Sequence, residues 1–238
     1  MAKSFEELDY QKTPWGEVIL QRRTAFECDG QEVFEVKLNG EYLMSSLFVE
    51  GEVALTNLGL DTLSGDSWQV VVGGLGLGYT AEAALKYNEV SKLTIVEANR
   101  PVIDWHEREL VPNGALFNSD ERCEYLFDDF FKLARTTGFN PESPNYQYDA
   151  ILLDIDHTPS ALLNPSHGDF YSEEGMLKIK TFLKPGGVFA LWSNDKPEDA
   201  FLTIMKAAFG EVEGHVVEFA NPMQGGVSTN GVYVGRAK

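Results

Sequence analysis

A run of glycines followed by an acid is the first feature of this sequence that could do chemistry. Gly73, Gly74, Gly76 and Gly78 stand in the segment VVVGGLGLG. Glycines there allow a tight turn from a strand into a helix and let a ligand approach the helix N-terminus. Glu97 ends the apolar segment KLTIV about 20 residues later, where an acid commonly binds ribose hydroxyls. The two signals predict a nucleoside site; the alternative is a ligand-free turn beside a solvated glutamate.

Polar residues follow other apolar segments in the same way. Asp128, Asp154 and Asn194 lie at the ends of predicted strands or just beyond them. Ligands of parallel sheets bind outside the carboxyl ends of the strands, so these side chains are expected to share one site with Glu97. His157 follows closely in IDHTP. A histidine there could be a general base, and a loop histidine that hydrogen-bonds locally is an equal alternative.

Three further features surround this group. Asp154 and Asp156 have the spacing of some metal sites, but no third ligand is placed to complete a shell, so no metal is expected. Trp192 and Asn194 end a predicted strand and could line an acceptor pocket, although a tryptophan in this position is more often core. Residues 160–170, which include His167, are predicted to form a flexible flap beside the site, with an ordinary surface loop as the alternative.

The elements that must position these residues alternate between strand and helix from residue 67 onward. Strands are expected at 68–72, 92–97, 123–127, 149–154, 188–192, 213–219 and 231–235. Helices are expected at 79–87, 101–110, 130–135, 172–182 and 200–209. This alternation predicts an α/β fold with a mainly parallel sheet and helices on both faces.

The first part of the chain has a different pattern. Residues 17–22 and 32–38 alternate between apolar and polar, and Asn39-Gly40 is a strong hairpin signal before a return strand at 41–48. A helical stretch follows at 53–63. We therefore expect a β-rich antiparallel appendage over residues 1–65 and a catalytic domain over residues 66–238.

Composition limits the classes of partner. The chain has 238 residues, 19 Lys and Arg against 37 Asp and Glu, and a formal charge of −18. Such a charge repels nucleic acid and anionic membranes and favours a small cationic substrate, although acidity often serves only solubility. No apolar run approaches the roughly 20 residues that span a bilayer. The polar N-terminus and two distant cysteines, Cys28 and Cys123, predict a cytoplasmic protein with free thiols.

The order of these motifs is similar to that of class I S-adenosylmethionine-dependent transferases, and within them it resembles the spermidine synthase (polyamine aminopropyltransferase) family. The resemblance covers most of the chain, from about residue 35 to residue 193. It is carried by the segments KLNGEYLMSS, VVVGGLGLG, TIVEANRPVID, YLFDDFF, YDAILLDIDHTP and FYSEEGMLKIKTFLKPGGVFALW.

The resemblance implies roles for individual residues. The four glycines would contact the amino-acid-like or sulfonium end of the cofactor, and Glu97 would hold the ribose. Asp128 would accept a hydrogen bond from the adenine amino group, helped by the backbone near Asp129. Asp154 would bind and deprotonate the attacking amine, as the family's aspartate does. Asp156 or His157 would stand near the position of a further family aspartate, and relatives with such an appendage often form homodimers through it.

Several family residues are replaced. The acid of the glycine loop is Gly76 here, a glutamine after the hairpin turn is Leu43, and a polar cluster of the next helix reads Leu55, Thr56 and Asn57. These losses favour methyl transfer from S-adenosylmethionine to a small amine-bearing acceptor. Two alternatives stay open: an aminopropyltransferase that uses decarboxylated S-adenosylmethionine, and a non-catalytic protein that binds nucleosides or polyamines.

Overall fold

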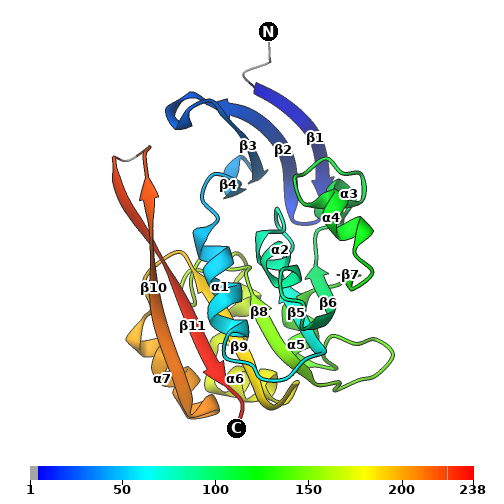
Figure 1. The fold of residues 1–238 in the computed structure, drawn as a ribbon, viewed down its shortest axis with the longest axis vertical. Coiled ribbons are helices and arrows are strands. Elements are labelled where there is room, and N and C mark those ends of the chain that lie inside the picture. The colour runs from blue at the N-terminus through cyan, green and yellow to red at the C-terminus, as the bar shows by residue number, and fades with distance from the viewer. Residues whose placement is uncertain (1–4, 224) are drawn as a thin grey trace.

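Two β-sheets lie one above the other in the computed structural model, which describes residues 5–223 and 225–238 (Figure 1). The smaller, antiparallel sheet has the order β1-β2-β3-β4. Its strands are β1 (Phe5–Thr13), β2 (Gly16–Ala25), β3 (Gln31–Leu38) and β4 (Glu41–Ser45), with a short 3₁₀ helix at Phe26–Cys28. Asn39 and Gly40 both adopt positive φ in the β3–β4 turn, which confirms the predicted hairpin.

The larger sheet has seven strands in the order β10-β11-β9-β8-β5-β6-β7. Its strands are β5 (Trp68–Gly73), β6 (Val90–Glu97), β7 (Cys123–Phe127), β8 (Tyr148–Leu153), β9 (Leu183–Ser193), β10 (Glu211–Asn221) and β11 (Gly226–Arg236). Strands β5 to β9 pair in parallel, whereas β11 pairs antiparallel with β9 and β10. The predicted mainly parallel α/β fold is confirmed.

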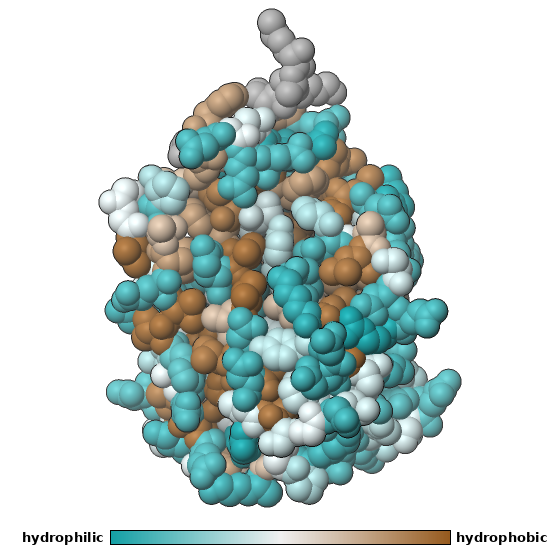
Figure 2. Space-filling model, in the orientation of Figure 1, coloured by the Kyte–Doolittle hydropathy of each residue, from teal (hydrophilic) through white to brown (hydrophobic). Residues whose placement is uncertain are grey.

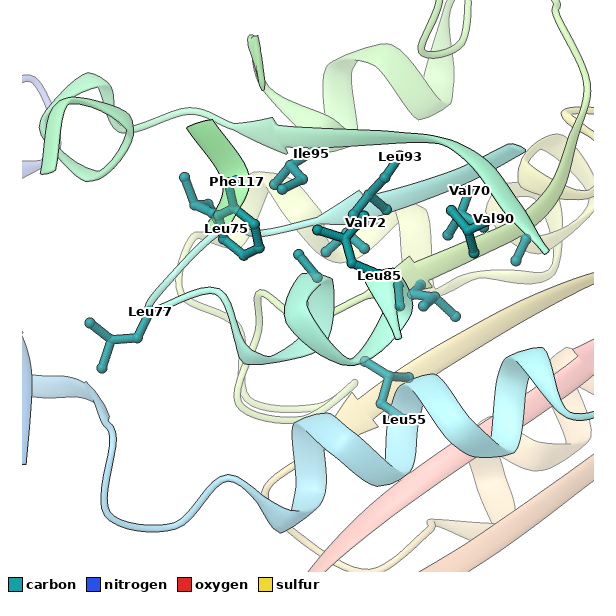
Figure 3. Packing of buried hydrophobic residues seen from close by; sticks show 14 of the residues in the cluster. Leu55, Val70, Val72, Leu75, Leu77, Leu85, Val90, Leu93, Ile95 and Phe117 are labelled. Carbon is teal, nitrogen blue, oxygen red and sulfur yellow. The ribbon is translucent and has the colours of Figure 1, made fainter. Parts of the chain in front are cut away.

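Helices cover both faces of this sheet because its strands are apolar on both sides. The helices are α1 (Glu50–Leu60), α2 (Tyr79–Leu85), α3 (Arg100–Glu107), α4 (Gly114–Ser119), α5 (Phe130–Arg135), α6 (Glu173–Lys180) and α7 (Asp199–Phe209). Within β5, Val70 and Val72 pack towards α1 to α4, and Val71 packs towards α5 to α7. Figure 3 shows Val70 and Val72 beside Leu85, with Leu55 of α1 nearby. Each such side chain contributes about 1.5–3 kcal/mol on burial.

The small sheet shares a core with the large one. Val18, Leu20 and Val36 are buried in the same cluster as Leu55 of α1. Asp9 of β1 also accepts a hydrogen bond of 2.7 Å from the Trp105 indole of α3. These contacts hold the small sheet over the edge where the parallel strands end. In Figure 2, hydrophobic residues show around α1 and to its left, interspersed with hydrophilic residues over the rest of the view.

The structure differs from the sequence prediction in several places. Strand β1 and helix α4 were not predicted, and α1 begins at Glu50 rather than at residue 53. Residues 160–170 are an anchored segment that ends in a 3₁₀ helix at Pro165–Tyr171, not a free flap. Helix α1 packs on β9 and β11, so it joins the large sheet although it precedes the predicted domain boundary at residue 65. Among the described residues, no helix is long and apolar enough to cross a membrane.

The turn after β5 depends on glycine at one position above all. Gly74 has a φ of +94°, and a Cβ placed there would lie 2.1 Å from the backbone oxygen of Asp154. Its amide donates to the carbonyl oxygen of Val96 at 2.9 Å, while the amide of Asp154 donates to that of Gly73 at 2.8 Å. The ends of β5, β6 and β8 therefore meet backbone to backbone.

We expect Gly74→Ala to lower the free energy of unfolding by about 3–5 kcal/mol, because backbone strain and an overlap with backbone atoms add together. Gly186→Ala is the matched control, since Gly186 has a φ of +82° and nothing within 4 Å of its added Cβ. Gly186→Ala should lower the free energy of unfolding by the cost of backbone strain alone, about 1–2 kcal/mol. Denaturant unfolding measures both values, and equal losses would contradict the close approach.

Candidate active site

A cavity of about 620 Å³ lies between the two sheets, at the carboxyl ends of the parallel strands. That volume suits a nucleoside-sized ligand together with a small second substrate. Nine of the predicted site residues line it: Gly74, Gly76, Gly78, Glu97, Asp129, Asp154, His157, Trp192 and Asn194. Gly73, Asp128 and Asp156 are not among its lining residues.

Glu97 holds the glycine loop in place. Its carboxylate accepts hydrogen bonds from the amides of Leu75 at 3.0 Å and Asn99 at 2.7 Å. Burial raises the pKa of Glu97, and these amide donors partly offset that rise. Each carboxylate oxygen has more than one lone pair, so the side chain can still accept from two hydroxyl groups in the cavity.

Two carboxylates, one from each side of the cavity, face the same space. Asp154, at the end of β8, accepts a hydrogen bond of 2.8 Å from the buried Thr80 hydroxyl. Burial raises the pKa of Asp154 to about 6. Burial and the charge of Asp154 raise the pKa of Glu52, on α1, to about 8. The pair therefore favours a proton, or a bound cation, at neutral pH.

Glu52 is the main residue that the sequence analysis missed. The predicted helix began at residue 53, and the family's polar cluster was matched to Leu55, Thr56 and Asn57. Glu50 and Glu52 carried the available signal, because acids are favoured in the first turn of a helix. That signal marks a helix start and does not by itself predict a site.

The small sheet closes the cavity from above. A Cβ on Gly76 would lie 2.7 Å from the sulfur of Met44, so this side chain fills the space above the loop where the family has an acid. Trp15 and Asn39, from the two hairpin turns, also line the cavity. Phe48 packs on Phe219 of β10, with ring centroids 5.5 Å apart. The appendage is thus part of the site.

Asp128 and Asp129 are engaged locally. The Asp128 carboxylate accepts from Lys132 Nζ at 2.9 Å and from the Asp129 amide at 2.8 Å, and the lysine helps lower its pKa against the opposing effect of burial. Asp129 caps α5 by accepting from the amides of Phe131 and Lys132. Both contacts leave acceptor capacity on the Asp128 carboxylate, so its contact with adenine stays a prediction.

Asp156 is 1% exposed and organises the segment that follows it. It accepts hydrogen bonds from the Leu163 amide, the Nδ1 atom of His167 and the Tyr171 hydroxyl, at 2.7–3.0 Å. These contacts anchor residues 160–171 and leave Asp156 behind the cavity wall, so its predicted contact with substrate has no support in the geometry.

The far end of the cavity contains His157, Trp192 and Asn194. His157 is exposed, and its carbonyl oxygen accepts from the Asn194 amide at 2.7 Å. The Trp192 indole Nε1 is buried and has no hydrogen-bond partner among the residues that the structure describes. A Cβ added to Gly51 would lie 2.4 Å from this atom, so the indole nitrogen faces α1.

Comparisons with known proteins agree with this geometry. A family model described as "Spermine/spermidine synthase domain" matches residues 52–214. A curated polyamine aminopropyltransferase from Prochlorococcus marinus (strain NATL1A) is 29% identical over 162 residues, 67% of this chain and 50% of that protein. One from Sulfolobus acidocaldarius is 29% identical over 126 residues, 51% of this chain and 37% of that protein. The chain thus spans half or less of the length of these two curated relatives.

Solved structures show the same fold. A crystal structure of spermidine synthase in complex with the transition-state analogue AdoDATO has a TM-score of 0.72 at 18% identity, covering 98% of this chain and 74% of that chain. Spermidine synthase from Thermotoga maritima has a TM-score of 0.71 at 17% identity, covering 98% of this chain and 73% of that chain.

The carboxylate pair predicts a pH-dependent stability. An acid whose pKa is higher in the folded state binds more protons there, so stability falls as pH rises between the unfolded and folded values. That interval runs from about 4 in the unfolded chain to about 8 for Glu52. We expect Glu52→Gln to flatten this fall, since it removes one group and lowers the pKa of Asp154.

Chemical unfolding between pH 5 and pH 9 measures the effect. Glu142→Gln, at an exposed acid in a turn, is the control and should follow the wild-type profile. Parallel profiles for wild type and Glu52→Gln would contradict the raised pKa of Glu52.

Proposed function

The chain belongs to the spermine/spermidine synthase family, and on that premise we propose that it transfers an aminopropyl group from decarboxylated S-adenosylmethionine to an amine. The donor would lie along the carboxyl ends of β8, β5 and β6. The acceptor amine would enter between α1, β8 and the small sheet. Methylthioadenosine would leave as the second product.

The observation that carries this proposal is the charge of the cavity. Glu52 and Asp154 face its interior, and Glu97 and Asp129 also line it. No lysine or arginine lines the cavity in the part of the chain that the structure describes. An ammonium group relieves the repulsion between buried carboxylates, whereas the α-carboxylate of S-adenosylmethionine would add to it. This favours the decarboxylated donor.

The glycine loop is compatible with that donor although Gly76 replaces an acid. Glu52 reaches the same cavity from α1 and can pair with a cationic amine in place of the missing side chain. Methyl transfer was the expectation from the sequence because no motif there replaced the missing carboxylate. The curated relatives are polyamine aminopropyltransferases, which supports the aminopropyl alternative over methyl transfer.

Asp154 would prepare the nucleophile. An alkyl amine is protonated at neutral pH and must lose a proton before it can attack carbon. A carboxylate with a raised pKa is a better proton acceptor than an ordinary one, and Thr80 fixes its orientation. The amine nitrogen then forms a bond to the propyl carbon while the carbon–sulfur bond breaks and its electron pair stays on sulfur. The protein's main contribution is in-line alignment of the two substrates.

A donor comparison tests the proposal directly. The protein is incubated with putrescine and either decarboxylated or ordinary S-adenosylmethionine, and methylthioadenosine and S-adenosylhomocysteine are quantified. We expect methylthioadenosine from the decarboxylated donor. Asp154→Asn should lower kcat by about 10²–10⁴-fold, the usual loss on removing a general base. Asp169→Asn, at an exposed acid of the nearby 3₁₀ helix, should leave turnover unchanged.

Each other outcome has a definite meaning. S-adenosylhomocysteine as the product would establish methyl transfer instead. Tight binding of the donor with no product from putrescine, longer polyamines or simple monoamines would make the protein a non-catalytic nucleoside-binding protein.

A further inference from the structure

His167 is a buried histidine with one ring nitrogen in hydrogen-bond contact with a carboxylate and the other facing no described partner. The residue is 6% exposed, lines the cavity, and stacks on Phe131 with ring centroids 3.8 Å apart. Its Nδ1 atom lies 2.9 and 3.0 Å from the two carboxylate oxygens of Asp156. Its Nε2 atom has no hydrogen-bond partner among the described residues.

The position of His167 follows from the order of strands. Asp154, the glycine loop and Glu97 stand at the ends of β8, β5 and β6, and α5 begins at the end of the next strand, β7. A nucleoside with its sulfur near Asp154 and its ribose on Glu97 must direct its base towards β7 and α5. Phe131 belongs to α5, so the base reaches the wall where His167 stacks.

Asp128, the residue expected to bind the adenine amino group, stands between the end of β7 and the start of α5. Its carboxylate pairs with Lys132 and accepts from the Asp129 amide, and it does not line the cavity. We infer that His167 binds the base edge, accepting a hydrogen bond through Nε2 from the exocyclic amino group of adenine. The inference rests on the proposed function, because it needs an adenosine-bearing donor.

Asp156 acts as the positioning residue for this contact. A buried carboxylate accepts only, so in the neutral ring it fixes the proton on Nδ1 and leaves the Nε2 lone pair free. Further donors from Leu163 and Tyr171 hold that carboxylate still. A ring fixed in this way accepts from an amino group and disfavours the carbonyl oxygen of a 6-oxopurine.

Calorimetric titration with 5′-methylthioadenosine and 5′-methylthioinosine at pH 8 tests the inference. The wild type should bind the amino compound at least about tenfold more tightly, the usual value of one specific hydrogen bond. His167→Phe keeps a ring to stack on Phe131 and should lose most of this discrimination through weaker binding of methylthioadenosine. His215→Gln, on β10 beside Glu213 and away from the cavity, should keep it.

The ¹⁵N NMR spectrum of the histidines supplies a readout that does not depend on a folded variant. In wild type, Nε2 of His167 should be the unprotonated nitrogen and should shift on addition of methylthioadenosine. Equal binding of both nucleosides by wild type, full discrimination by folded His167→Phe, or a proton on Nε2 would each overturn the assignment. Binding of neither nucleoside would overturn the proposed function as well.

Discussion

The close approach of three backbones at the end of β5 is the constraint on which the rest of the site depends. The turn at Gly74 places its amide against β6 and leaves no room for a side chain before Asp154 of β8. Because the strands meet this closely, Glu97 and Asp154 stand on either side of one short loop. The loop then needs little else to position it, since Glu97 itself accepts the amide of Leu75.

The carboxylates around this loop lower the stability of the folded protein and prepare the cavity for a cation. A carboxyl group that is buried without a cation costs free energy, and the raised pKa values of Glu52 and Asp154 express that cost. Elsewhere the chain pairs its buried acids, as Asp156 shows with three donors. The unpaired acids gather where a cationic substrate is expected to bind.

The sequence predicts the site residues whose positions follow from the strand in which they stand. It does not predict the residues that reach the site only when distant elements pack together. Glu97 and Asp154 were found because each ends an apolar strand, and parallel strands place their ends together. Glu52 was missed because it reaches the site only when α1 packs on the large sheet, against strands β9 and β11 that come much later in the sequence. The role of Asp128 came from the family resemblance, which does not reveal its ion pair with Lys132 one helical turn away. The contact between Asp156 and His167 likewise spans a loop whose path no pattern predicts.

The small sheet and the β10–β11 hairpin enclose the cavity from outside. This arrangement affects how the binding specificity of such a protein can change during evolution. The walls above the glycine loop come from the ends of the chain, through Trp15, Met44 and Phe219, whereas the loop and Glu97 come from its middle. Substitutions in the outer segments can therefore reshape the space for an acceptor without moving the backbone that would hold the nucleoside. A lineage built on this plan can exchange one acceptor for another through surface hairpins while it inherits its donor site intact.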